Sequence, residues 1–216
     1  GHNQVLGQWP VSVSHHVFCN PDIGVTEQAL VRIAELARAS DAALLMPHVV
    51  YPDGRRQELC KLLPTPLNLF ARRFLPWLGN KLDHRYLLRD ADYTQSFFVP
   101  SLSGCFMVCR VDALQAVGGF DERYFMYMED VDLGDRFGRA GYSNVLCPSA
   151  EITHAKGHAA GENPAAMLPA HHDSAYRFIA DRHAAWWQAP LRLVVRIGLK
   201  MRACIAVYSA RRGQAS

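Results

Sequence analysis

The feature that most constrains this sequence is an acidic block that ends the stretch from residue 118 to residue 133. The stretch opens with a Gly-Gly pair, continues through four aromatic residues, and then places Glu129, Asp130 and Asp132 almost side by side. Carboxylates in the first turn of a helix are stabilised by the helix macrodipole, by a few tenths to about 1 kcal/mol each. The stretch therefore predicts a helix that starts at the acidic block and ends at Gly141, where glycine favours a helix stop.

Two interpretations of the acidic block are open. In the first, Glu129 and Asp130 are part of a well-capped acidic helix on a solvated surface. In the second they are chemically active, because apolar walls raise the pKa of a carboxylate toward values that suit a general base. The second is favoured because the pair directly follows apolar and aromatic residues. Asp132, two positions on, should point elsewhere on the helix, so Asp130 is the preferred base.

Composition indicates a globular protein, because half of the 216 residues are hydrophobic. Six of the 23 basic residues follow Pro190, which leaves 17 basic against 20 acidic residues before it. This uneven charge is not that of a nucleic-acid binder, and it favours contact between the basic end and an anionic membrane surface. The sequence contains no stretch of about 18 uncharged apolar residues, so it predicts no transmembrane helix. The six scattered cysteines, Cys19 among them, are expected to be mostly buried free thiols.

A strand is expected over residues 11–19, followed by an Asn-Pro-Asp turn that ends at Asp22 and by a helix over residues 27–39. A second strand over residues 41–46 completes a strand–helix–strand unit with parallel strands. Open α/β sheets bind ligands at the carboxyl ends of such strands. Asp22 is then a candidate ligand for a hard cation, and Asn20 supplies an uncharged oxygen. An ordinary polar turn is the alternative.

Later segments predict further strands over residues 97–99, 104–109, 144–147 and 150–154. A short helix is expected from residue 113 to residue 117, with Asp112 in a capping box. His154 follows the last of these strands. A lone histidine is more often a structural hydrogen-bonding residue, and that interpretation stays open beside a functional one. His171 and His172 are expected in a loop, and Ser174 is expected to open a helix.

In this order, the blocks resemble the second half of the GT-A domain of family 2 glycosyltransferases, most closely the bacterial rhamnosyltransferase-like branch. Members show a Ser/Gly-Gly-x-Phe strand, a Gly-Gly-Phe-Asp-Glu turn, a Glu-Asp-x-Asp-Leu helix start and a later His, and all four occur here. The resemblance implies an α/β, Rossmann-like GT-A fold: a mixed, mostly parallel sheet flanked by helices, with a C-terminal helical extension. We expect a partial GT-A domain over residues 1–165 and the extension over residues 166–216.

The resemblance implies inverting transfer of a sugar from a nucleotide-diphosphate donor, dTDP-rhamnose in this branch. The acceptor would be a lipid-linked saccharide or polysaccharide of cell-surface glycan synthesis. Asp130 is then the general base, Glu129 binds the acceptor or orients Asp130, and Asn20 and Asp22 lie at the donor diphosphate. Asp22 and His154 are the expected ligands of a divalent cation, Mg²⁺ or Mn²⁺. Family members carry a second carboxylate where this chain has Asn20, although the rhamnosyltransferase-like branch often has Asn-Pro-Asp, so metal dependence needs its own test.

Other residues receive roles from the same resemblance. Ser103, Gly104 and Tyr127 are candidate contacts for the sugar or the acceptor, since glycine allows a close approach to the backbone. Arg177 is a candidate contact for the donor diphosphate, because relatives often carry a Ser and an Arg there. The basic and apolar segment over residues 51–93 lies near the acceptor opening in relatives and would suit a lipid diphosphate. A solvated loop with helices packed on the sheet is the alternative.

The C-terminal region predicts a membrane-surface element. Two tryptophans precede a helix over residues 191–208 in which Arg192, Arg196 and Lys200 recur every four residues, hence along one stripe. Tryptophans beside a basic amphipathic helix are typical of membrane interfaces. We therefore expect a cytoplasmic protein, peripheral on the inner face of the bacterial cell membrane. A terminal helix packed on the domain or on a second subunit is the alternative.

The first residues and the function leave further alternatives. Relatives carry an element similar to Gly1-His2-Asn3 partway through the fold, so we expect a fragment that lacks the first strands and helices. A cloning remnant at Gly-His is the other explanation. A nucleotidyltransferase, a metal-dependent hydrolase and a non-catalytic sugar-binding or assembly module of the same fold are the competing functions.

Overall fold

The computed structural model describes residues 2–6, 8, 12–74, 76–155 and 164–213. Contacts divide the chain into two compact units. The first comprises Gly1–Leu63, His84–Asp121 and Glu129–Lys156, and the second comprises Pro64–Asp83, Glu122–Met128 and Gly157–Ser216.

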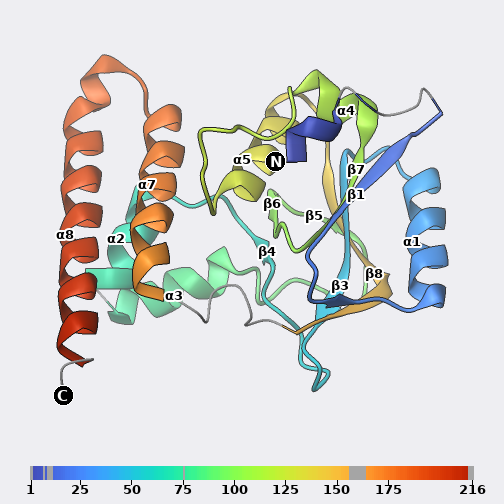
Figure 1. Cartoon of the computed structure of the whole chain (residues 1–216), viewed down its shortest axis with the longest axis horizontal. Coiled ribbons are helices and arrows are strands. Elements are labelled where there is room, and N and C mark those ends of the chain that lie inside the picture. The colour runs from blue at the N-terminus through green and yellow to red at the C-terminus, as the bar shows by residue number, and fades with distance from the viewer. Residues whose placement is uncertain (1, 7, 9–11, 75, 156–163, 214–216) are drawn as a thin grey trace. The chain divides into compact units, whose positions relative to one another are not determined.

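The described part of the first unit is built on a six-stranded sheet in the order β1-β7-β3-β8-β2, with β5 paired to β8 (Figure 1). Its strands are β1 (His15–Cys19), β2 (Ile23–Gly24), β3 (Leu44–Val50), β5 (Phe97–Phe98), β7 (Phe106–Arg110) and β8 (Asn144–His154). β3 and β8 are parallel over the longest register, and the other pairs are antiparallel. A separate ladder joins β4 (Cys60–Lys61) to β6 (Ser101–Leu102). The predicted α/β class with a mixed sheet flanked by helices is confirmed.

The predicted strand–helix–strand unit is present with one difference. α1 (Glu27–Ala39) begins where expected, because Thr26 Oγ1 accepts a hydrogen bond from Ala29 N at 3.1 Å. Ala29, Ile33 and Ala37 recur every four residues and form its buried face. β1 and β3 are parallel because both are antiparallel to β7, but β7 lies between them. The two strands are therefore not direct neighbours.

Several local predictions are wrong. α4 (Val111–Ala116) starts at Val111, so Asp112 lies in the first turn of the helix and the capping box is absent. The Asp112 Oδ1 atom instead accepts a hydrogen bond from Ala113 N at 2.7 Å. The two strands expected over residues 144–154 form one continuous strand, β8. All six cysteines are free, and four are buried as expected, but Cys19 is exposed on the edge strand β1.

The core of the first unit holds the acidic helix in place. α5 (Glu129–Arg139) starts at the predicted residue and packs against β6 and β8. Leu133 and Phe137, four residues apart, are fully buried. Burying side chains of this size contributes about 1.5–3 kcal/mol each. This apolar anchor fixes the direction of α5 and hence the position of its acidic first turn.

The glycine turn before α5 is held by the first described residues of the chain. Gly118 and Gly119 have φ of 75° and 71°, a region that glycine enters without steric cost. A Cβ on Gly119 would collide with Leu6 and lie 2.5 Å from Asn3 Oδ1. Asn3, in the short helix η1 (His2–Val5), donates from Nδ2 to Phe120 O at 2.7 Å and accepts from Phe120 N at 2.8 Å. The Asn3 amide thus pairs with the backbone of Phe120 as a strand would.

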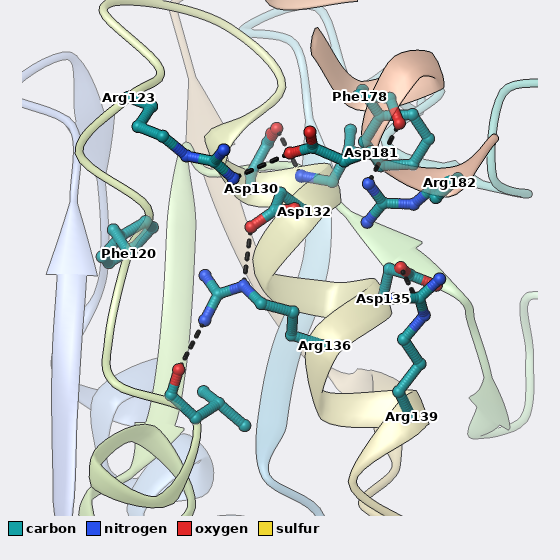
Figure 2. Close-up of polar contacts among 12 residues, drawn as sticks. Phe120, Arg123, Asp130, Asp132, Asp135, Arg136, Arg139, Phe178, Asp181 and Arg182 are labelled. Atoms are coloured by element: carbon teal, nitrogen blue, oxygen red, sulfur yellow. Dashed lines mark hydrogen bonds and ion pairs between the residues drawn. The ribbon is translucent and has the colours of Figure 1, made fainter. Parts of the chain in front are cut away.

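The last acid of the block has a structural role. Asp132 is only 4% exposed, and its Oδ2 lies 2.6 Å from Arg136 Nε one turn along α5. Arg136 Nη1 in turn donates to Val117 O at 2.8 Å, so the pair ties α5 to the end of α4 (Figure 2). Asp135 and Arg139 form a similar pair at 3.2 Å on the more exposed side of the helix. Asp132 therefore points away from the acidic start of α5, as predicted.

The second unit is helical. Its described helices are α2 (Pro66–Phe74), the first part of α3 (Pro76–Tyr86), α7 (Pro164–Arg182), the short η2 (Trp186–Gln188) and α8 (Ala189–Gly213). α7 and α8 pack as an antiparallel hairpin (Figure 1). Arg192 stabilises the turn between α7 and α8, because its Nη1 donates to His183 O and, at 2.9 Å, to Ala185 O.

α7 corrects two predictions. His171 and His172 lie inside this helix and not in a loop, and Ser174 lies in its middle and does not open it. On α8, the apolar side chains at positions 193, 194, 197, 201 and 205 are exposed. None of the helices within the described ranges combines the length and the hydropathy that a membrane crossing requires.

Candidate active site

His154, at the end of β8, lies beside Asp22, with 3.3 Å between Nε2 and Oδ2. Backbone pairing produces this contact. β2 follows Asp22 directly and pairs Ile23 with His154, and Ala155 N donates to Asp22 O at 3.1 Å. The structure thus brings together the two residues that the sequence nominated for a divalent cation.

The ring orientation of His154 is set by Gln57, a buried residue that the sequence did not single out. Gln57 Nε2 donates to His154 O at 2.8 Å and to Val50 O at 3.4 Å. Gln57 Oε1 is therefore the atom that faces His154 Nδ1, at 2.9 Å. Because an amide oxygen only accepts hydrogen bonds, Nδ1 carries a proton and Nε2 is directed at Asp22.

This arrangement suits a divalent cation in one specific way. His154 Nε2 and Asp22 Oδ2 lie 3.3 Å apart, so both could bind the same cation. Metal-binding histidines usually donate their other ring N–H to a fixed acceptor, the role that Gln57 fills here. Within the described ranges, no third His, Cys, Asp or Glu completes a metal-binding group. The remaining ligands would be water and diphosphate oxygens, as is common for Mg²⁺.

A second group of predicted residues meets at Gly104 and Cys105, between β6 and β7. Asn20 N donates to Cys105 O at 2.9 Å, and Gly104 N donates to Asp130 Oδ2 at 2.8 Å. The Asn-Pro-Asp turn and the start of α5 therefore contact the same two-residue segment. Asp22 and Asp130 are carried by chain segments that converge there, and not by opposite sides of the unit.

Backbone groups hold the Asp130 carboxylate on both sides. Oδ2 accepts from Gly104 N, and Oδ1 accepts from Val131 N at 2.8 Å. With these two partners among the described residues, each oxygen has a second lone pair that can accept the proton of a hydroxyl group. A Cβ on Gly104 would lie 3.4 Å from the Asp130 Cβ, so the glycine leaves room for this carboxylate. Ser103 and Gly104 thus border Asp130, while their contact with a sugar stays a prediction.

Among the residues that the structure describes, Glu129 is the carboxylate whose pKa is raised. Burial is the main cause, and the negative charge of Asp130 adds to it. Glu129 Oε2 is buried and has no hydrogen-bond partner among the described residues. A buried carboxyl group without a partner is unusual in a folded protein, and such groups with raised pKa values cluster at functional sites.

The raised pKa predicts a stability effect of definite sign. Between the ordinary pKa of 4.5 and the higher folded value, the folded state binds more protons than the unfolded chain. The free energy of unfolding therefore falls as pH rises through that range. Glu129→Gln should be more stable than wild type at about pH 7.5 and should lose this advantage below about pH 4. Denaturant unfolding at several pH values checks this, with Glu27→Gln at the exposed start of α1 as control. A stability difference that is the same at every pH would contradict it.

The segment that leads into α5 belongs to the second unit and is held by α7. Ser174 Oγ donates to Met126 O at 2.7 Å, and the Tyr127 ring packs edge-on against His171, with centroids 5.2 Å apart. Tyr127 and Met128 have φ of 66° and 69°. Residues other than glycine rarely adopt this left-handed conformation, which costs of order 1–3 kcal/mol per residue. The strain lies immediately before the acidic helix.

Arg177, the predicted phosphate contact, also lies on α7 in the second unit. Its side chain lines a cavity between α7 and α8. Nearby, Arg123 Nη2 and Asp181 Oδ2 form an ion pair at 2.7 Å that joins the segment before α5 to α7 (Figure 2). Arg177 is therefore placed among charged residues of its own unit.

Comparison with known proteins adds a homologous enzyme. Over 199 residues the chain is 56% identical to the N-acetylglucosaminyl-diphospho-decaprenol L-rhamnosyltransferase of Mycobacterium tuberculosis, in strains CDC 1551/Oshkosh and ATCC 25618/H37Rv. The match covers 91% of this chain but 64% of each relative, so the chain spans less than two thirds of their length. No family model matches the chain.

Proposed function

We propose, from its confirmed resemblance to the rhamnosyltransferase-like branch of family 2 glycosyltransferases, that this chain carries the catalytic carboxylates of an inverting rhamnosyltransferase. The donor is dTDP-rhamnose, and the acceptor is a saccharide linked through a diphosphate to a polyprenol, the class named for the relatives. One observation carries the proposal: the turn of Asp22 and the start of α5 at Asp130 converge on Gly104 and Cys105.

Asp130 acts as the general base. It takes the proton of the acceptor hydroxyl while that oxygen attacks the anomeric carbon of rhamnose, and the bond to the donor diphosphate breaks. A single displacement of this kind inverts the configuration of the carbon. Base catalysis contributes typically about 10²–10⁴-fold. Glu129, beside Asp130, binds the acceptor or orients the base.

The donor diphosphate lies at Asn20 and Asp22. Asp22 and His154 would hold the Mg²⁺ or Mn²⁺, with His154 Nε2 presented by Gln57. A bound cation supplies neutralisation of the charge that develops on the leaving diphosphate. Because the chain itself offers two ligands, we expect cation and donor to bind together.

The protein is cytoplasmic and peripheral on the inner face of the cell membrane. Support comes from α8 and η2, where Trp186 and Trp187 are exposed next to the exposed apolar side chains of α8. Arg196 and Lys200 are exposed as well. Arg192 is excluded from this role, because its guanidinium is bound to backbone oxygens of the turn between α7 and α8.

The function is tested by incubating the protein with a panel of nucleotide sugars and an N-acetylglucosaminyl-diphospho-prenol acceptor. We expect a rhamnosylated product by mass spectrometry from dTDP-rhamnose, with inverted configuration by NMR. Chelation of divalent cations should reduce the rate, and Mg²⁺ or Mn²⁺ should restore it. Transfer of another sugar would correct the donor. Retention of configuration would contradict the role of Asp130.

A further inference from the structure

The second unit contains two adjoining cavities. The first, of about 670 Å³, lies between α7 and α8 and is called the cationic cavity here. The second, of about 390 Å³, lies between α2 and the α7–α8 hairpin and is called the apolar groove. Leu199 and His172 line both cavities, so the two cavities lie next to each other.

Basic residues from both helices face the cationic cavity. Arg177 comes from α7, and Arg196 and Lys200 lie one turn apart on α8. The Arg196 guanidinium is 5.5 Å from the centroid of the Tyr176 ring, which limits its motion. Two acids also line the cavity, Asp173 and Asp181, and Asp181 is already paired with Arg123. The cavity therefore keeps an excess of positive charge, which suits a diphosphate.

The apolar groove has a different chemistry. Its lining is mostly aliphatic and aromatic, and its polar members are the two histidines of α7 and Arg202. Leu67 and Phe70 of α2 and Val194 of α8 are exposed although they lie in this lining. A volume near 390 Å³ is within the range of sites that hold small apolar ligands.

We propose that these two cavities together form the subsite for the lipid end of the acceptor, and this assignment rests on the proposed function. The diphosphate lies in the cationic cavity, near Arg177, Arg196 and Lys200. The first isoprene units lie in the apolar groove. Only an amphiphile with its charge bonded directly to a hydrocarbon chain uses both cavities. A free phosphate or a lipid headgroup would use the first alone, and an apolar peptide would use the second alone.

Binding of a soluble probe tests the subsite without donor or membrane. The probe is farnesyl diphosphate, and the comparison ligands are inorganic pyrophosphate and farnesol, all titrated calorimetrically into the protein. Each buried CH₂ strengthens binding roughly fourfold, so even a few buried carbons change the affinity measurably. We expect farnesyl diphosphate to bind at least about tenfold more tightly than either comparison ligand.

Gly198 allows the groove to be filled without disturbing the fold. It lines the apolar groove from α8, and a Cβ built on it meets no atom within 4 Å. Replacing a helical glycine should also stabilise α8, because glycine loses more conformational freedom on folding than other residues. We expect Gly198→Leu to lower the affinity for farnesyl diphosphate at least tenfold. The affinity for pyrophosphate and the thermal stability should not fall. Gly198→Ala is the matched control and should bind like wild type.

Charge variants and one thiol test the cationic cavity. Arg196→Gln and Lys200→Gln should weaken the binding of both farnesyl diphosphate and pyrophosphate. Arg38→Gln, an exposed change on α1, should leave the binding of both unchanged. Cys204 lines this cavity and is exposed, and Cys19 is exposed elsewhere. Farnesyl diphosphate should therefore slow alkylation of Cys204 severalfold and leave Cys19 unchanged, as peptide mass spectrometry would measure.

Three results would overturn the subsite. Pyrophosphate that binds as tightly as farnesyl diphosphate indicates a phosphate site only. Wild-type affinity in Gly198→Leu removes the groove from the site. An unchanged alkylation rate of Cys204 at saturating farnesyl diphosphate removes the cationic cavity from the site. None of these assays contains a sugar donor, so a failure of rhamnosyl transfer leaves the subsite standing. Normal transfer without prenyl binding would overturn the subsite alone.

Discussion

Asp130→Asn should reduce rhamnosyl transfer by about 10²–10⁴-fold while the donor still binds. The amide has the shape of the carboxylate but cannot take the proton of the acceptor hydroxyl. It also loses one of the two acceptors that now serve Gly104 N and Val131 N. A backbone N–H left without an acceptor costs about 1–3 kcal/mol, so stability must be measured beside activity. Steady-state rates and dTDP-rhamnose titration calorimetry on the same preparation separate the two effects.

Asp135→Asn provides the matched control for this variant. It changes the same residue type on the same helix and removes an ion pair in which only the Arg139 end is exposed. Because the Asp135 side chain is only 10% exposed, the variant can lose some stability, but it touches neither Asp130 nor the backbone donors of Asp130, so transfer by the folded protein should remain close to wild type. Near-normal transfer by Asp130→Asn would remove Asp130 from the role of base. Equal losses in both variants would point to a general effect of charge on α5.

Asp22→Asn should lower kcat/KM by at least about 100-fold, because a metal-bound leaving group is worth several kcal/mol in the transition state. The loss is expected in cation binding itself. Mn²⁺ titrated into protein with dTDP and followed by electron paramagnetic resonance should bind at least tenfold more weakly. His154 Nε2 would remain, but the neutral amide replaces the only carboxylate that it faces in the described residues.

Gln57→Met extends this test to the residue behind the histidine. It leaves His154 Nδ1 without its acceptor, and loss of such an outer partner typically weakens metal binding about 10–100-fold. Asp53→Asn, on the exposed turn just before it, is the control and should bind Mn²⁺ normally. Wild-type Mn²⁺ affinity in Asp22→Asn would exclude the Asp22–His154 cation site. Full activity under chelation would show that transfer needs no metal.

The parts of this fold that depend on local signals were predictable from the sequence. The start of α1 at Thr26 and of α5 at Glu129 follow from capping and from charge at a helix end, and both are confirmed. The convergence at Gly104 and Cys105 involves Asn20 and Asp130, which strand ends and helix starts had already marked.

Non-local pairing explains most of what the sequence did not predict. β7 lies between β1 and β3 because of a ladder that no local pattern encodes. Gln57 is 97 residues from His154, within a segment whose irregular pattern gave it no signal. α7 continues through Pro169 and the two histidines because packing against α8 outweighs weak local preference.

The pairing of Asn3 with Phe120 has a consequence for the order of events during synthesis. Asn3 leaves the ribosome 117 residues before its partner, a delay of roughly 6 to 23 s at ordinary elongation rates. Until then the Asn3 amide lacks the backbone of Phe120, and the double-glycine turn, which is synthesised just before Phe120, cannot form. The geometry that aims the acidic helix is therefore completed late, when two distant parts of the nascent chain meet.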